Sequence, residues 1–136
     1  MECKFGFLCD YAQDSAGKLH AIGIGWDTLY ARGFPTVHPM MCFVAVLRGT
    51  IAERGTKKVV LRLLDADGND VLPEQEQQIP FAVRPPNVEG NVNIILQLGG
   101  LKFAKPGQYA FSLLVQDNHV LTIPFSVLEP PITATA

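Results

Sequence analysis

The stretch Lys105 to Val127, K-P-G-Q-Y-A-F-S-L-L-V-Q-D-N-H-V-L-T-I-P-F-S-V, carries the clearest secondary-structure signal in the chain. Pro106 and Gly107 predict a tight turn, because proline fixes φ and glycine tolerates positive φ. Apolar residues then alternate with smaller or polar ones on both sides of a short polar Asp-Asn step. This pattern is typical of a β-hairpin with one buried face. The buried face is expected to hold Tyr109, Phe111, Leu113, Val115, Leu121, Ile123, Phe125 and Val127.

Similar alternation, read outward from this hairpin, predicts about eight strands and no helix. Turn signals separate the runs at intervals typical of a β-sandwich. We therefore expect an all-β protein, an antiparallel β-sandwich of immunoglobulin-like or related Greek-key type. It should form a single domain over residues 1–128, followed by a flexible C-terminal tail at 129–136. The other predicted strands cover residues 3–11, 18–26, 40–48, 57–65, 79–84 and 91–98.

Composition excludes some functions and favours others. A net charge of −2 with mixed signs lacks the basic surface that nucleic-acid binding requires. No run of 18 apolar residues is present, so no membrane span is expected, and the N-terminus lacks a secretory signal, which predicts a cytoplasmic protein. Hydrophobic residues make up 48% of the chain and charged residues only 18%. This balance favours a surface for a protein partner or for a second copy of the chain.

The predicted strand at 40–48, M-M-C-F-V-A-V-L-R, is apolar on both faces. Such a strand is either covered on both sides or covered on one side by a partner. If the protein assembles, one of the two faces should be partly exposed in the isolated subunit. The two faces are Met41 with Phe43, and Cys42 with Val44 and Val46.

The N-terminal stretch 9–27, C-D-Y-A-Q-D-S-A-G-K-L-H-A-I-G-I-G-W-D, holds the only tryptophan of the chain. Gly23 and Gly25 alternate with larger residues, which indicates that a backbone or a large side chain lies close to that face. We expect Tyr11 or Trp26 to fill this space as part of the core.

The candidate binding residues lie in and after this stretch. Asp10 and Asp27 each end a predicted strand near the same end of the molecule, and the long irregular segment 28–39 follows. Because loops of this length often carry binding residues, we predict a protein-binding surface. The simpler alternative is that the aspartates cap nearby backbone while the aromatic residues pack into the core. The predicted surface consists of Asp10, Trp26, Asp27, Tyr30 and Phe34.

Catalytic signals are weak. The three histidines, His20, His38 and His119, are spread over the chain, without the short-range pairing of a metal site. No nucleophile elbow, P-loop or dinucleotide fingerprint is present, so neither a cofactor nor an enzyme is predicted. The alternative is a small enzyme in which Cys9 or Cys42 meets His20 or His38 in the folded chain.

An acidic turn offers a second alternative, a calcium-binding sandwich. Asp65, Asp67, Asn69 and Glu76 match the ligand positions of an EF-hand loop. Asp70 stands where that loop needs glycine, and strands flank it in place of helices. A D-G reverse turn between two strands explains the same residues, so no metal is predicted.

Two resemblances follow from these residues. The pattern F-x-x-P-G-x-Y from Phe103 to Tyr109 resembles the closing strands of many immunoglobulin-like domains.

The segments C-D-Y-A, G-K-L and G-x-G-W-D within 9–27, with P-G-x-Y and P-F-x-V near the C-terminus, resemble a family of small bacterial proteins classed as a domain of unknown function. The resemblance covers nearly the whole chain. It implies a bacterial, cytosolic, single-domain sandwich and supplies no activity, substrate or catalytic residue. The leading prediction is therefore a non-catalytic protein-interaction or self-assembly module.

Overall fold

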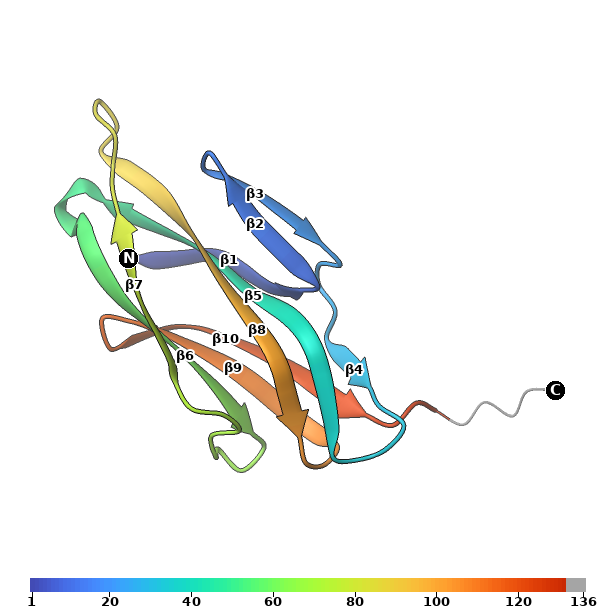
Figure 1. The fold of residues 1–136 in the computed structure, drawn as a ribbon. Helices are drawn as coiled ribbons and strands as arrows, with labels where there is room; N and C mark the ends of the chain where they lie inside the picture. Colours follow the sequence, from blue (N-terminus) through green and yellow to red (C-terminus); the bar gives the residue numbers. More distant parts are fainter. Residues whose placement is uncertain (132–136) are drawn as a thin grey trace.

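The computed structural model describes residues 1–131, which form ten strands and no α-helix (Figure 1). None of these residues forms a helix long and apolar enough to cross a membrane. A short 3-10 turn, η1 (Ile51–Glu53), follows the fifth strand. The strands are β1 (Glu2–Cys9), β2 (Tyr11–Ser15), β3 (Lys18–Ile22), β4 (Thr28–Tyr30), β5 (Thr36–Thr50), β6 (Gly55–Asp65), β7 (Gln75–Phe81), β8 (Glu89–Phe103), β9 (Gly107–Val115) and β10 (Asn118–Leu128).

The strands form three sheets, with the orders β1-β5-β8, β4-β10-β9-β6-β7 and β2-β3. All-β structure is confirmed, but two details of the prediction are wrong. The five-stranded sheet is mixed, because β4 pairs with β10 in parallel. The strand count is ten, because the predicted strand 3–11 breaks at Asp10 and the predicted loop 28–39 contains β4 and the start of β5.

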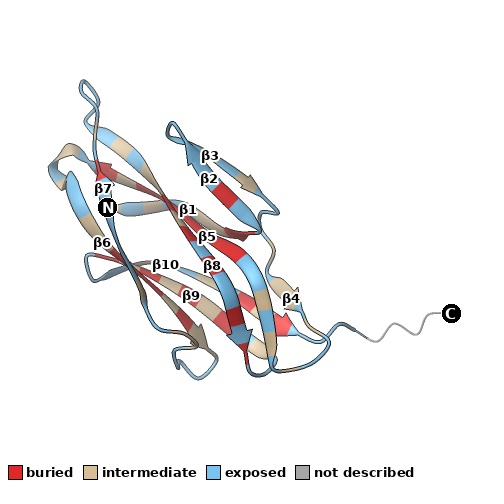
Figure 2. Cartoon of the chain, viewed as in Figure 1, coloured by how far each residue is buried: buried red, intermediate tan, exposed pale blue. Residues whose placement is uncertain are grey.

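The core lies between the two larger sheets, and the buried segments in Figure 2 belong to strands of both. Aromatic rings dominate it. The ring centroids of Phe43 on β5 and Phe111 on β9 lie 5.7 Å apart, and Phe111 stacks on Phe125 of β10 at 5.3 Å. The predicted buried face of the β9–β10 hairpin is confirmed for six of its eight residues, while Leu121 and Ile123 are only half-buried.

The hairpin β2–β3 covers the outer face of the sheet β1-β5-β8. Ala12 of β2 is buried against Cys9, Cys42 and Val44, and Leu19 of β3 packs beside them. Both faces of β5 between Met41 and Leu47 are therefore buried. The prediction that one face of this strand is partly exposed is wrong, because the chain covers the strand with its own hairpin. The two faces concerned are Met41 with Phe43, and Cys42 with Val44 and Val46.

The strand β5 is longer than the strand that borders it on one side. β8 pairs with β5 from Thr36 to Thr50, whereas β1 pairs only with its second half, from Cys42 to Arg48. Beyond the end of β1, the chain crosses from one large sheet to the other through residues 23–27 and enters β4. Of the predicted binding residues, Trp26 and Asp27 lie in this crossing segment.

Candidate protein interface

Trp26 sits in the crossing segment and packs inward. Its indole meets the ring of Phe125 edge-on at 6.0 Å and the ring of His38 at 6.1 Å. It is half-buried against the main core, so the prediction that the tryptophan contributes to the core is confirmed. It does not lie on a strand, because β3 ends at Ile22.

The space beside Gly23 is taken by Asp10. A Cβ atom on Gly23 would lie 2.3 Å from a carboxylate oxygen of Asp10, and φ of Gly23 is +71°. The backbone N–H of Asp10 donates to the carbonyl of Ile22 at 3.0 Å, which ties the two ends of the hairpin together. The prediction of a close approach is confirmed at Gly23, where the filling group is Asp10 in place of Tyr11 or Trp26, and it is wrong at Gly25, which has nothing within 4 Å of a Cβ position.

His38 links two of the predicted site residues. Its ring contacts Trp26, and its Nε2 atom is buried without a hydrogen-bond partner among residues 1–131. Burial lowers the pKa of His38, and the nearby Asp10 carboxylate opposes this change only in part. The imidazole is therefore neutral at pH 7.

A shallow cleft of about 180 Å³ opens between β4 and the start of β5. This β4–β5 cleft is smaller than most small-molecule sites, which span roughly 300–1,000 Å³. Tyr30 forms part of its rim and is exposed. The cleft is lined by Leu29, Tyr30, Ala31, Thr36, Val37, His38, Pro39, Phe103 and Val127.

The remaining two predicted residues lie apart from this group. Asp27 faces β10, where its backbone carbonyl accepts from the N–H of Ser126 at 2.8 Å and its carboxylate accepts from the Thr28 hydroxyl at 3.0 Å. Phe34 is half-buried and packs against the main core. The fold therefore groups Asp10 and Trp26 around His38 and places Tyr30 at the adjacent cleft.

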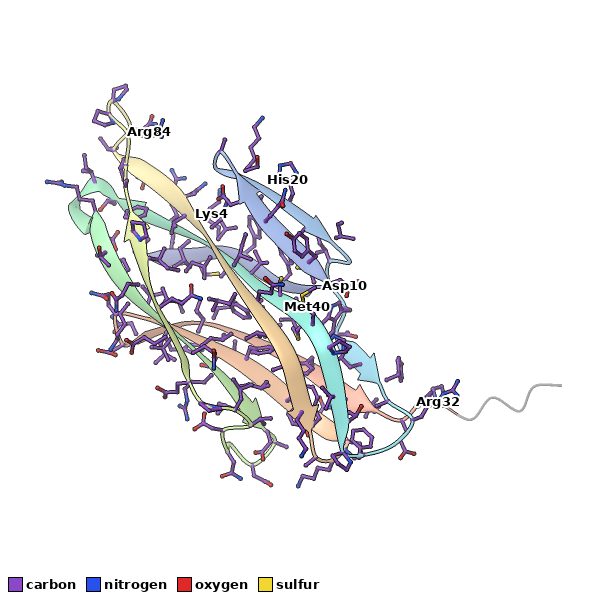
Figure 3. The ribbon with its side chains drawn as sticks, in the orientation of Figure 1. Lys4, Asp10, His20, Arg32, Met40 and Arg84 are labelled. Carbon is purple, nitrogen blue, oxygen red and sulfur yellow. The ribbon has the colours of Figure 1, made fainter. Side chains whose placement is uncertain are left out.

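Four exposed apolar residues beside this group were not predicted. Tyr11 and Ile22 are register partners at the base of the β2–β3 hairpin, and Ile22 is 69% exposed. Ile24 follows at 58%, and Met40 lies on β5 two residues from the covered Cys42. Figure 3 labels Asp10 and Met40 close to one another in this region. We call Tyr11, Ile22, Ile24 and Met40 the hairpin-foot surface.

The two core cysteines face each other across β1 and β5. Cys9 and Cys42 are register partners, and both are fully buried. Burial, followed by the proximity of Cys42, raises the pKa of the Cys9 thiol to about 11. A nucleophilic cysteine needs the opposite shift, toward a lower pKa. No cysteine–histidine hydrogen bond occurs within residues 1–131, and Cys9 instead contacts the carbonyl of Cys42 at 3.9 Å.

The acidic turn after β6 is occupied by its own backbone and side chains. Oδ1 of Asp65 accepts from the N–H groups of Asp67 and Asn69, both at 2.9 Å. These bonds lower the pKa of Asp65. Asp70 forms a two-pronged ion pair with Arg62 at 3.1 Å. The reverse turn predicted here is confirmed, and the carboxylates of Asp65 and Asp70 already have partners.

The geometry defines an all-β protein that carries an exposed apolar surface beside a small cleft. The chain belongs to the family of unknown function DUF6941, whose model matches residues 4–128. The predicted membership in a family of unknown function that spans nearly the whole chain is thereby confirmed. No curated protein matches the chain.

Proposed function

We propose that the chain is a non-catalytic, immunoglobulin-like domain of a bacterial cytoplasmic protein, and that it binds a protein partner through the hairpin-foot surface and the β4–β5 cleft. The observation that carries this proposal is the group of four large apolar side chains at the hairpin foot. Each of them is at least 42% exposed, and the cleft lies beside them. Tyr11 and Ile22 are register partners, Ile24 follows them in the chain, and exposed apolar side chains that gather in this way mark interaction sites in soluble proteins.

The strand order supports an immunoglobulin-like arrangement. In such domains strands A, B and E share one sheet, and C, F and G share the other. Here β1, β5 and β8 correspond to the first group, and β6, β9 and β10 to the second. Tyr109, near the start of β9, donates its hydroxyl to the carbonyl of Lys105 at 2.6 Å. This contact has the form of the tyrosine corner of immunoglobulin-like domains.

The size of the cleft favours a protein partner over a small-molecule substrate. An enzyme would need a polar, concave site with a titratable group poised for chemistry. The β4–β5 cleft is smaller than such sites, and the Nε2 atom of His38, which lines it, is buried and has no hydrogen-bond partner within residues 1–131. A partner side chain is the occupant that matches this volume and lining.

Site-specific photocrosslinking tests the proposal. A benzophenone amino acid is placed at Ile24 or Tyr30 in the source cells, and the control carries it at Val88, which is also exposed and apolar but lies before β8. We expect one protein to be captured from positions 24 and 30 and not from 88. With that protein purified, Ile24→Asp and Met40→Asp should weaken binding about tenfold or more, while Val88→Asp should not. Equal capture from all three positions would contradict the proposal.

A further inference from the structure

The strand β8 has an edge with which no other described strand pairs. Fourteen of its fifteen residues pair with β5 on one side, and no strand within residues 1–131 pairs with the other side. Long free edges are commonly protected by proline, by charges or by a covering segment. β8 contains no proline, and its only charged residues are Glu89 at one end and Lys102 near the other. In an immunoglobulin-like sheet, a fourth strand, D, occupies this position.

Hydrogen bonds at β1 show which backbone groups face this edge. The carbonyl of Leu8 and the N–H of Asp10 bond to the crossing segment and to β3, so both point away from β5. Because the direction of the backbone N–H and C=O groups alternates along a strand, those of Cys9 and of its partner Cys42 point toward each other. The backbone N–H and C=O of Cys42 therefore point away from β8. Gln97 is the partner of Cys42 on β8, and its backbone N–H and C=O likewise point away from β5. By the same alternation, Asn93, Ile95 and Gln97 direct their N–H and C=O groups to the free edge.

We propose that this edge pairs with the β8 edge of a second copy, antiparallel and centred on Ile95. In that register, Ile95 exchanges two backbone hydrogen bonds with Ile95 of the other copy, and Asn93 exchanges two with Gln97. The inward residues Val92 and Leu98 face each other on the core side. The two three-stranded sheets then become one six-stranded sheet that closes by two-fold symmetry.

The charges at the ends of β8 fit this pairing. Side chains alternate between the inner and outer face along β8, but this alternation shifts by one residue at Gly99 and Gly100. The shift is visible because Leu98 and Leu101, three residues apart, are both buried. Gly100 has φ of +62°, so one residue here can be left unpaired as a β-bulge. With that one-residue shift, Lys102 of one copy lies opposite Glu89 of the other, with both side chains on the outer face. The symmetry gives two such pairs per dimer.

Space is available at the edge. A groove of about 300 Å³ lies between residues 97–102 of β8 and the segment 71–75 that precedes β7. The exposed Lys102 has no ion-pair partner in residues 1–131, whereas Glu89 bonds to Arg48 at 2.6 Å and keeps about half of its side chain exposed. The groove leaves room for an additional strand, and Lys102 is free to pair with it.

Charge reversal tests the register. Lys102→Glu and Glu89→Lys should each raise the dimer dissociation constant about tenfold in analytical ultracentrifugation, since two exposed pairs become repulsive. The double variant Glu89→Lys with Lys102→Glu should restore dimerisation. Lys105→Glu, in the loop after β8, is the matched control and should have no effect. A protein that stays monomeric at millimolar concentration, or a dimer that none of these changes affects, would overturn the proposal.

Crosslinking provides a second readout that does not depend on charge. Ile95→Cys should form a disulfide-linked dimer under mild oxidation in a Cys3→Ser background, because paired residues at the two-fold centre lie about 5.5 Å apart. Gln108→Cys, at an exposed position on the other sheet, should stay monomeric. Crosslinking of the Gln108 variant alone would place the interface elsewhere and contradict the proposal. This edge is separate from the hairpin-foot surface, so either proposal can fail while the other stands.

Discussion

Cys9 illustrates how burial sets the chemistry of a single residue. Its thiol is fully buried beneath the β2–β3 hairpin, and its pKa lies at about 11, above the ordinary value of 9.0. Free cysteine is among the most buried residue types in proteins, and Cys9 and Cys42 are both buried free thiols in the structure. The sequence did not predict that the two are opposite each other, because that depends on the register of β1 against β5.

The raised pKa of Cys9 predicts a pH dependence of stability. In the unfolded chain the thiol ionises near pH 9, while in the folded chain it stays neutral until about pH 11. The free energy of unfolding therefore includes a contribution from Cys9 that is constant below pH 8 and lost between pH 9 and 11. Urea unfolding of the native protein and of Cys9→Ala should show this loss only in the former. Parallel curves for the two proteins through pH 11 would contradict it.

Among the predicted site residues, the sequence pattern predicted the positions of two aromatic residues better than that of Asp10. Trp26 and Phe34 pack inward, as the simpler alternative predicted. The carboxylate of Asp10 instead lies against Gly23. Ile22 and Ile24 were missed because isoleucine in a strand pattern normally indicates core. Their neighbours Gly23 and Gly25 offered the available signal, since they mark the end of the strand.

At the scale of elements, the alternation of apolar and polar residues did not predict where the β2–β3 hairpin lies relative to the sheets. The prediction placed Tyr11 at the end of the strand 3–11 and β3 within a strand 18–26, yet the chain turns out of the sheet at Asp10 and β3 ends at Ile22. The apolar character of both faces of β5 correctly indicated coverage on both sides. The covering element could not be identified from pattern, because Ala12, Leu19 and Ala21 are small or common residues with no distinctive periodicity.

The junction of hairpin and sheet predicts a graded response to alanine. Gly23→Ala should destabilise the protein by about 2 kcal/mol or more, because a positive φ and a clash with Asp10 combine. Gly17→Ala, at the tip of the same hairpin, also has positive φ but has open space around it, so it should cost only about 1 kcal/mol. Chemical denaturation measures both. Hydrogen exchange should also increase in β2 and β3 of the Gly23 variant, and equal costs at the two sites would rule out the clash.

For the whole molecule, the class of fold was predictable and its assembly was not. The turn signals and alternating runs around Tyr109 to Val127 gave the β9–β10 hairpin with its buried face. The parallel pairing of β4 with β10 joins residues from opposite ends of the chain. No local pattern encodes such a contact, because β4 has only three residues and its position depends on the completed core.

The shared aromatic core predicts cooperative unfolding. Phe125 contacts the rings of Trp26, Phe103, Tyr109 and Phe111, and these residues come from the crossing segment, β8 and β9. Phe125→Ala should cost about 3–5 kcal/mol and leave a single transition by both fluorescence and circular dichroism. Tyr30→Ala, at an exposed position, should change stability by less than about 0.5 kcal/mol. Separate transitions by the two probes would show that the sheets unfold independently.

The position of β9 and β10 also bears on how the protein is made. In the sheet β4-β10-β9-β6-β7, the central strand is β9, at Gly107–Val115. The strand β4 can pair only after β10 has been synthesised as far as Leu128. A nascent chain on the ribosome therefore exposes β4 and the apolar faces of β5 and β6 until its last strands emerge. Folding of this domain is then coupled to the synthesis of β9 and β10, and a chain that stops before them would lack the strands that bury its aromatic residues.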